Sequence, residues 1–192
     1  MCQINIAIFA SGSGTNAENL IKFFSGSKHI KIAVVMSNKN DAYVLERARK
    51  FGIPTYTFTS SELSSTSLVD QMLDSYKIEA IVLAGFLLKI PERILQILPD
   101  RILNIHPALL PKFGGKGMYG MNVHKAVIEA GEIESGITIH LVDGKYDNGV
   151  TLFQAKCEIG KNETPESLAE KIHKLEYSNF PKVVNEYLMN LL

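Results

Sequence analysis

The segment Asn104-Ile105-His106-Pro107 contains the residues whose types and spacing best suit catalysis. Alternate residues of an extended strand point to the same face, so the Asn104 amide and the His106 imidazole are expected to lie side by side. Pro107 favours an extended backbone at His106 and thereby fixes how the imidazole is presented. Together, the two groups can bind a developing oxyanion and move a proton near neutral pH. The alternative is a core histidine, with Asn104 closing a loop.

A second kind of chemistry is indicated by the stretch Ser11-Gly12-Ser13-Gly14-Thr15-Asn16, which follows an apolar run and precedes a helical pattern. Its glycines allow a tight turn, and free N–H groups at the start of a helix bind anions. The spacing differs from the G-x-G-x-x-G dinucleotide fingerprint, and the lysine of a nucleoside-triphosphate loop is absent. The stretch therefore predicts a site for a single phosphate monoester, with a plain tight turn as the alternative.

Two pairs of polar residues are further candidates. Asp143 and Asp147 lie in a turn-rich segment, where aspartates usually cap backbone N–H groups. They would gain a role beside His106, because a nearby carboxylate raises the pKa of an imidazole. His173 and Glu176 are three residues apart in a helical pattern and share a face, which is usually a solvated one. The five histidines lack the spacing of metal ligands, so we expect no metal.

The elements that must position these residues alternate between strands and helices as far as residue 106. The pattern predicts strands at 4–10, 32–36, 55–58, 80–84 and 102–106, and helices at 16–24, 42–51, 65–76 and 91–98. Strands that are apolar nearly throughout and separated by helices indicate a parallel sheet covered on both faces. We therefore expect an α/β protein with a Rossmann-like three-layer αβα fold and with ligands at the carboxyl ends of its strands.

The second half of the chain has a different pattern. A loop is predicted at 110–120, where Pro111 and four glycines occur, followed by a helix at 122–130. Segments 136–142 and 150–159 alternate in polarity and are joined by turn-forming residues, which predicts an antiparallel hairpin appended to the sheet. A long helix is expected from Pro165 onward. Since no linker or repeat interrupts the pattern, residues 1–192 are expected to form one domain.

Composition excludes several classes of protein. The 192 residues carry 20 Lys and Arg against 20 Asp and Glu, and 46% are hydrophobic, which is typical of a folded globular protein. The absence of a basic excess argues against a nucleic-acid partner, and the apolar runs are too short to span a membrane. The first apolar run lacks a basic region before it, so we expect no signal peptide. Cys2 and Cys157 form neither a disulfide framework nor a metal-binding pattern, so we expect a cytoplasmic protein with reduced thiols.

Over nearly its whole length, the sequence resembles the folate-dependent phosphoribosylglycinamide formyltransferases of purine biosynthesis. The combination of Asn-x-His-Pro with Leu-Leu-Pro-Lys is typical of folate-dependent formyltransferases, and the first loop and the length are typical of the glycinamide branch. The resemblance rests on segments 11–16, 37–39, 45–48, 83–86, 104–112, 136–140 and 147–149.

This resemblance implies a formyltransferase fold and transfer of the formyl group of 10-formyltetrahydrofolate to the amino group of 5-phosphoribosylglycinamide. It also implies that Asn104, His106 and Asp147 form the catalytic set, without a covalent enzyme intermediate. Asn104 and His106 are expected to stabilise the tetrahedral oxyanion, and His106 to transfer the proton. Asp147 is expected to orient the imidazole of His106 and to keep its pKa high.

The resemblance further implies where the two substrates bind. The phosphate is assigned to Gly14, Thr15 and Asn16, and the ribose hydroxyls to Glu176, with His173 nearby. The folate is expected to contact Leu87, Leu88, Lys89, Ile90, Asn104, Val142 and Asp143. The chain departs from the family pattern in lacking an arginine after segment 84–86 and another near 64–67. The resemblance therefore leaves the residues that hold the folate glutamate tail unassigned.

Other functions are weighed beside this one. A tRNA formyltransferase or a formyl-folate hydrolase shares the chemistry, but each usually has an additional domain that 192 residues do not accommodate. A non-catalytic phosphosugar-binding module would use the glycine-rich loop but not His106. A metal hydrolase would lose activity to chelators, which we do not expect. The expected partners are small-molecule substrates only, without nucleic acid or membrane, and the chain is expected to be a monomer or a homodimer.

Overall fold

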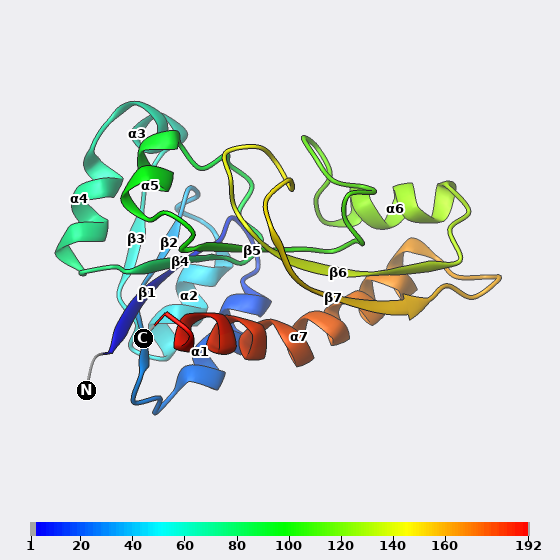
Figure 1. Ribbon diagram of the computed structural model, residues 1–192, viewed down its shortest axis with the longest axis horizontal. Coiled ribbons are helices and arrows are strands. Elements are labelled where there is room, and N and C mark those ends of the chain that lie inside the picture. Colours follow the sequence, from blue (N-terminus) through cyan, green and yellow to red (C-terminus); the bar gives the residue numbers. More distant parts are fainter. Residues whose placement is uncertain (1–2, 192) are drawn as a thin grey trace.

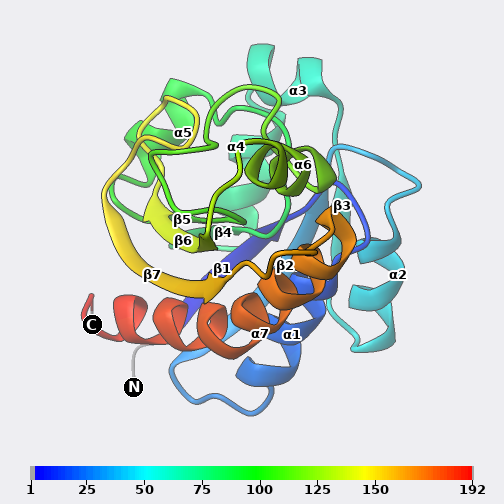
Figure 2. The ribbon, with the colours of Figure 1, turned by 90° about the vertical axis from the view of Figure 1, so that its right-hand side faces the viewer.

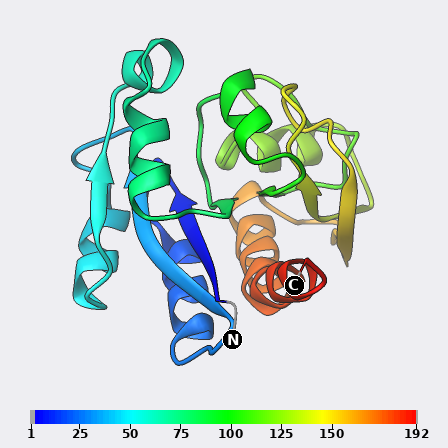
Figure 3. The same ribbon diagram turned by 60° about the vertical axis from the view of Figure 1, so that its left-hand side comes forward.

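A seven-stranded sheet forms the centre of the computed structural model, which describes residues 3–191. The strand order is β3-β2-β1-β4-β5-β6-β7, with β3 and β7 at the two edges (Figure 3). The first five strands pair in parallel and the last two antiparallel. They are β1 (Ile4–Phe9), β2 (Ile30–Ser37), β3 (Thr55–Thr57), β4 (Ala80–Leu83), β5 (Ile102–His106), β6 (Glu134–Leu141) and β7 (Thr151–Glu158). The predicted parallel sheet with an antiparallel hairpin is confirmed.

Helices cover both faces of the sheet (Figure 1). One face packs against α1 (Thr15–Phe24), α2 (Tyr43–Lys50) and α7 (Pro165–Met189), and Figure 2 shows α7 running beside α1. The other face packs against α3 (Ser60–Ser65), α4 (Leu68–Ser75) and α5 (Glu92–Ile97). The remaining helix, α6 (Met121–Glu129), contacts α7. Each face thus has its own apolar core, and the predicted three-layer arrangement is confirmed.

The helix predicted at 65–76 corresponds to α4, and a short additional helix, α3, precedes it. Helix α3 begins five residues earlier than the predicted helix, at Ser60, and α4 begins at Leu68. A capping box explains the early start: the Glu62 N–H donates to Thr59 Oγ1 at 3.1 Å, and the Thr59 N–H donates to Glu62 Oε2 at 2.6 Å. The pattern Thr-x-x-Glu at 59–62 was the sequence signal for this helix start.

The polar side chains of β6 hold the loop that follows β5. Ile137, Ile139 and Leu141 of β6 join the apolar core, whereas Thr138 is buried toward the loop. Thr138 Oγ1 donates to the Ala108 carbonyl at 2.7 Å and accepts from the Leu110 N–H at 3.0 Å. The alternation predicted for 136–142 therefore places an apolar row in the core and a polar row beneath the loop.

Two expectations about cysteines and membranes can be placed on the structure. Cys2 lies outside the described residues, and Cys157, on β7, is a free thiol. In the part of the chain that the structure describes, none of the helices is both long and apolar enough to cross a membrane.

Candidate active site

A cavity of about 700 Å³ lies where β1, β4 and β5 end. Loops that follow these strands meet there with the loop before α6, the turn between β6 and β7, and one face of α7. This is the edge of a parallel sheet at which α/β proteins bind ligands. Many of the residues singled out in the sequence line this cavity: Gly14, Thr15, Asn16, Leu87, Asn104, His106, Asp147, His173 and Glu176.

The other residues predicted to contact folate lie beside this cavity. Leu88, Lys89, Ile90 and Val142 line a small adjoining pocket of about 50 Å³. Phe86, Asn104, Tyr146 and Asp147 line both pockets, so the two are neighbours. Asp143 lines neither pocket. Its carboxylate accepts from the Lys145 N–H at 3.0 Å and from the Asn148 amide at 2.7 Å, and thus closes its own turn.

The glycine-rich loop between β1 and α1 has a fixed shape. Gly14 precedes α1 with φ of 74°, in the left-handed region, and a Cβ there would lie 2.4 Å from the Val44 side chain. Arg47 Nε donates to the Ser13 carbonyl at 2.8 Å and holds the loop from α2. Since no side chain caps the start of α1, its first N–H groups remain free to bind an anion.

Asn104 is held by His140, its direct neighbour on the antiparallel strand β6. His140 Nδ1 lies 2.8 Å from the Leu141 carbonyl, which can only accept, so Nδ1 carries a proton. Asn104 Nδ2 can only donate and lies 3.0 Å from Nε2, so Nε2 is the accepting nitrogen. This bond uses one amide hydrogen of Asn104 and leaves the second free to donate to a ligand.

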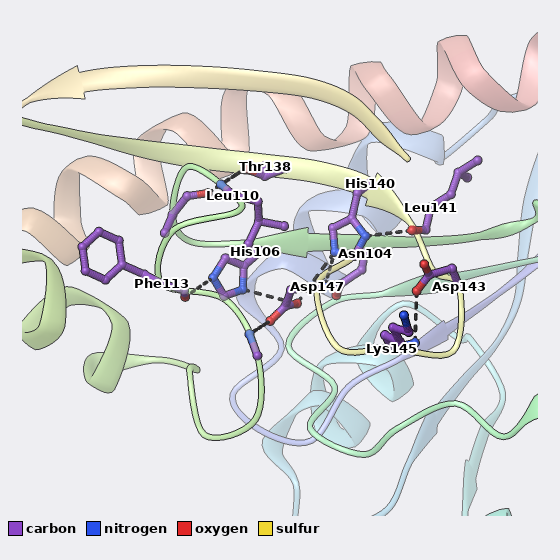
Figure 4. Close-up of polar contacts among 12 residues, drawn as sticks. Asn104, His106, Leu110, Phe113, Thr138, His140, Leu141, Asp143, Lys145 and Asp147 are labelled. Atoms are coloured by element: carbon purple, nitrogen blue, oxygen red, sulfur yellow. Dashed lines mark hydrogen bonds and ion pairs between the residues drawn. The ribbon is translucent and has the colours of Figure 1, made fainter. Parts of the chain in front are cut away.

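His106 lies against Asp147 and the loop after β5 (Figure 4). Its Nε2 donates to the Phe113 carbonyl at 2.8 Å, and its Nδ1 lies 3.5 Å from Asp147 Oδ1. Asp147 Oδ2 accepts from the Gly115 N–H at 2.8 Å, while Oδ1 also lies 3.8 Å from His140 Nε2. The Asp147 carboxylate thus lies between two imidazoles and is hydrogen-bonded to the loop at 114–120.

The electrostatics of this group favour a neutral imidazole beside an ionised carboxylate. Burial lowers the pKa of His106, and it outweighs the opposing effects of Asp147 and the Phe113 carbonyl. We expected Asp147 to keep the pKa of His106 high. The charge of Asp147 does raise this pKa, but burial lowers it by more, so the expected net direction is wrong. Burial also disfavours the charged form of Asp147, but the two imidazoles and the Gly115 N–H lower its pKa overall. At neutral pH, His106 Nδ1 is consequently an unprotonated acceptor.

At the opposite end of the cavity, Asn16 and Glu176 join α1 to α7. Asn16 Nδ2 donates to Glu176 Oε2 at 2.9 Å. Glu176 is 6% exposed, and this burial raises its pKa. Asn16 Oδ1 is buried without a hydrogen-bond partner among residues 3–191. Buried acceptors usually have a partner, so the pair is suited to a ligand that brings hydroxyl donors.

Sequence reasoning missed several residues of this site. Lys39, Lys116 and His124 line the cavity, and His140 holds Asn104. The position of Lys39 just after a predicted strand was a usable signal, because parallel strands end at the same edge of the sheet. His124 and His140 had no such signal, since their roles depend on the path of a loop and on strand register. Within residues 3–191, no three His, Cys, Asp or Glu side chains are grouped to hold a metal ion.

Comparisons with known proteins agree with this geometry. The model of the formyl transferase family matches residues 4–184. The chain is 42% identical over 186 residues to a chloroplastic phosphoribosylglycinamide formyltransferase of Arabidopsis thaliana, covering 93% of this chain and 63% of that protein. It is 37% identical over 184 residues to the phosphoribosylglycinamide formyltransferase of Haemophilus influenzae, covering 93% and 84%. The chain therefore spans less than two thirds of the plant relative but most of the bacterial one.

A solved structure extends this agreement to the fold. The glycinamide ribonucleotide transformylase 1 of Geobacillus kaustophilus superposes with a TM-score of 0.88 at 31% identity, covering 97% of this chain and 99% of that one. The fold described above is thus similar over nearly its whole length to that of a solved transformylase.

Proposed function

Because the chain belongs to the formyl transferase family, we propose that it transfers the formyl group of 10-formyltetrahydrofolate to the amino group of 5-phosphoribosylglycinamide. One observation carries the proposal: a single cavity joins a free helix start to the Asn104, His106 and Asp147 group. An acceptor with a phosphate at one end and an amine at the other can bind at both places. The names of the bacterial and plant relatives support this choice of acceptor.

The acceptor is proposed to bind along α1 and α7. The backbone N–H groups at Gly14, Thr15 and Asn16 receive the phosphate, since the start of α1 lacks a side-chain cap. Lys39 and Lys116 line the same cavity and add positive charge near an anion. The Glu176 and Asn16 oxygens accept from the ribose hydroxyls, with His173 nearby, and Asn16 Oδ1 gains the partner it lacks within the protein.

The folate is proposed to bind where the small pocket meets the main cavity. Leu88, Ile90 and Val142 give this pocket apolar walls, and its lining includes Asn104 and Asp147. Apolar walls with a few polar groups that fix orientation suit a flat aromatic ring. Leu87 and Lys89 lie on the same segment, and Asp143 contributes by shaping the turn. When bound, formyl-folate supplies the one-carbon unit next to the catalytic side chains.

The side chains divide the chemistry between them. As the substrate amine bonds to the formyl carbon, the free N–H of Asn104 donates to the developing oxyanion. His106 Nε2–H already donates to the Phe113 carbonyl, so we assign proton transfer to Nδ1. Nδ1 takes the proton that the attacking nitrogen loses, and Asp147 stabilises the imidazolium. The imidazolium then returns this proton to the folate nitrogen as its bond to the formyl carbon breaks, releasing the N-formyl product and tetrahydrofolate.

The remaining parts of the proposal concern the setting of the reaction. Residues 1–192 are taken as one formyltransferase domain. The protein is taken to act as a monomer or a homodimer. A cytoplasmic location is kept as a proposal, supported by the free thiol of Cys157.

The proposed reaction is tested by supplying both substrates to the purified protein. The expected result is equal formation of tetrahydrofolate and N-formyl product, followed by mass spectrometry, with folate turnover that depends on the acceptor. Equal folate turnover with and without the acceptor would instead indicate a formyl-folate hydrolase. Formylation of methionyl-tRNA alone would indicate the tRNA-modifying branch.

The pH profile should report the neutral state of His106. Since Nδ1 must be free to accept a proton and burial lowers its pKa, kcat/KM should be retained below pH 6.5 and fall only at lower pH. Asp147 raises this pKa by its charge, so Asp147→Asn should move the acid limb to still lower pH and reduce the plateau rate. The measurement is kcat/KM between pH 4.5 and 9, with the exposed Asp74→Asn as control. A limb that moves upward in Asp147→Asn would contradict this assignment.

A further inference from the structure

His124 is a buried histidine that the mechanism above does not use. It lies on α6, is 3% exposed and lines the main cavity. Within residues 3–191, its Nδ1 is buried and has no hydrogen-bond partner. Buried polar groups are rarely left unpaired, because each lost hydrogen bond costs free energy. The unpaired ring at the cavity wall therefore points to a ligand that brings its partner.

The position of His124 restricts the chemical identity of the ligand group that it can contact. His124 lines the same cavity as His173 and His106, and after burial the charges of these two histidines are what lower its pKa. An acceptor that extends along this cavity from the phosphate loop to His106 would pass His124 on its way. Burial lowers its pKa to about 4, so the ring is neutral in the physiological range. A neutral imidazole has one N–H donor and one unprotonated acceptor.

We infer that His124 binds the amide that links the ribose to the amine of the acceptor, and so selects an acceptor with this amide. The inference rests on the proposed function. An amide has one N–H and one carbonyl, and either can pair with the neutral ring. A phosphosugar without the amide leaves Nδ1 without a partner, as it is in the free protein.

Packing alone does not account for a histidine at this position. The neighbouring buried residues of α6 are apolar, namely Val123 and Val127, and both belong to the core of that face. A leucine at 124 would fill similar space without leaving a buried ring nitrogen unpaired. The unpaired polar ring therefore destabilises the free protein, and binding of the acceptor offsets this loss of free energy.

The test measures binding with two ligands that differ by the amide and amine. Calorimetric Kd values for 5-phosphoribosylglycinamide and for ribose 5-phosphate are compared in the wild type, His124→Leu and His124→Gln. For His124→Leu we expect the Kd of 5-phosphoribosylglycinamide to rise about ten-fold, with the Kd of ribose 5-phosphate nearly unchanged. His124→Gln retains a donor and an acceptor and should show a smaller loss. Val127→Ala, which alters the same buried helix face, should not discriminate between the ligands.

Each outcome decides the inference. An unchanged Kd of 5-phosphoribosylglycinamide in both His124 variants would overturn it, as would an equal weakening of both ligands, which indicates a role in pocket shape. If His124→Leu does not fold, the His124→Gln comparison of the two ligands decides alone. A wild type that binds ribose 5-phosphate but not 5-phosphoribosylglycinamide would overturn the proposed acceptor, and this inference with it.

Discussion

Replacing His106 by alanine is expected to lower kcat by about 10²–10⁴-fold, the usual range for loss of a general acid or base. His106 is the imidazole that accepts a proton at Nδ1 beside Asp147, whereas Nε2 of the neighbouring His140 already accepts from Asn104. The glycine-rich loop before α1 and Glu176 form another part of the cavity, so binding of the phosphosugar should persist. The measurements are steady-state kcat and the Kd of ribose 5-phosphate.

Two further variants separate chemistry from structure in this experiment. His106→Gln can keep an N–H near the Phe113 carbonyl but cannot carry the proton, so it should be nearly as inactive as His106→Ala. His29→Ala removes a partly buried histidine that lies outside the cavity lining and should retain wild-type kcat. Wild-type turnover in His106→Ala would favour the non-catalytic phosphosugar-binding module, which uses the loop alone.

The parts of the site that local sequence could predict are those carried by one strand or one loop. Asn104 and His106 are two residues apart, and strand geometry by itself places them on one face. The loop before α1 could also be predicted, because glycine at 14 is required by a left-handed backbone beside Val44. The parallel sheet followed from short apolar strands separated by helices, a pattern that needs no tertiary knowledge.

The parts that sequence could not predict depend on contacts between distant segments. His140 binds Asn104 only because the antiparallel register of β5 and β6 makes them direct neighbours. His124 reaches the cavity only because of the path of the loop at 114–120, which no periodicity describes. The pKa of His106 was predicted in the wrong direction for a similar reason: the carboxylate was visible in the sequence, whereas the burial that outweighs it was not.

Asn104→Ala is the second change with a large expected effect, because it removes the donor assigned to the oxyanion. Loss of one such donor typically lowers kcat by about 10²–10³-fold. Since the interaction forms as the transition state develops, the KM of both substrates should change much less than kcat. A fall confined to the KM of formyl-folate would instead make Asn104 a binding residue for the pterin, the other role that its place in both pockets permits.

His140 provides the test of how Asn104 is oriented. Its Nε2 accepts one amide hydrogen of Asn104, so His140→Phe should release the amide and lower kcat, although less than Asn104→Ala does. The two residues are in direct contact, and their effects should not add. In the Asn104→Ala background, His140→Phe should therefore cause little further loss of kcat, because no amide remains to be positioned. A purely structural role for His140 predicts the opposite, a full additional loss in the double variant, and thermal unfolding of all three variants shows whether stability contributes. The cycle thus distinguishes an imidazole that positions a catalytic amide from one that only fills the space between β6 and the turn of Asp147.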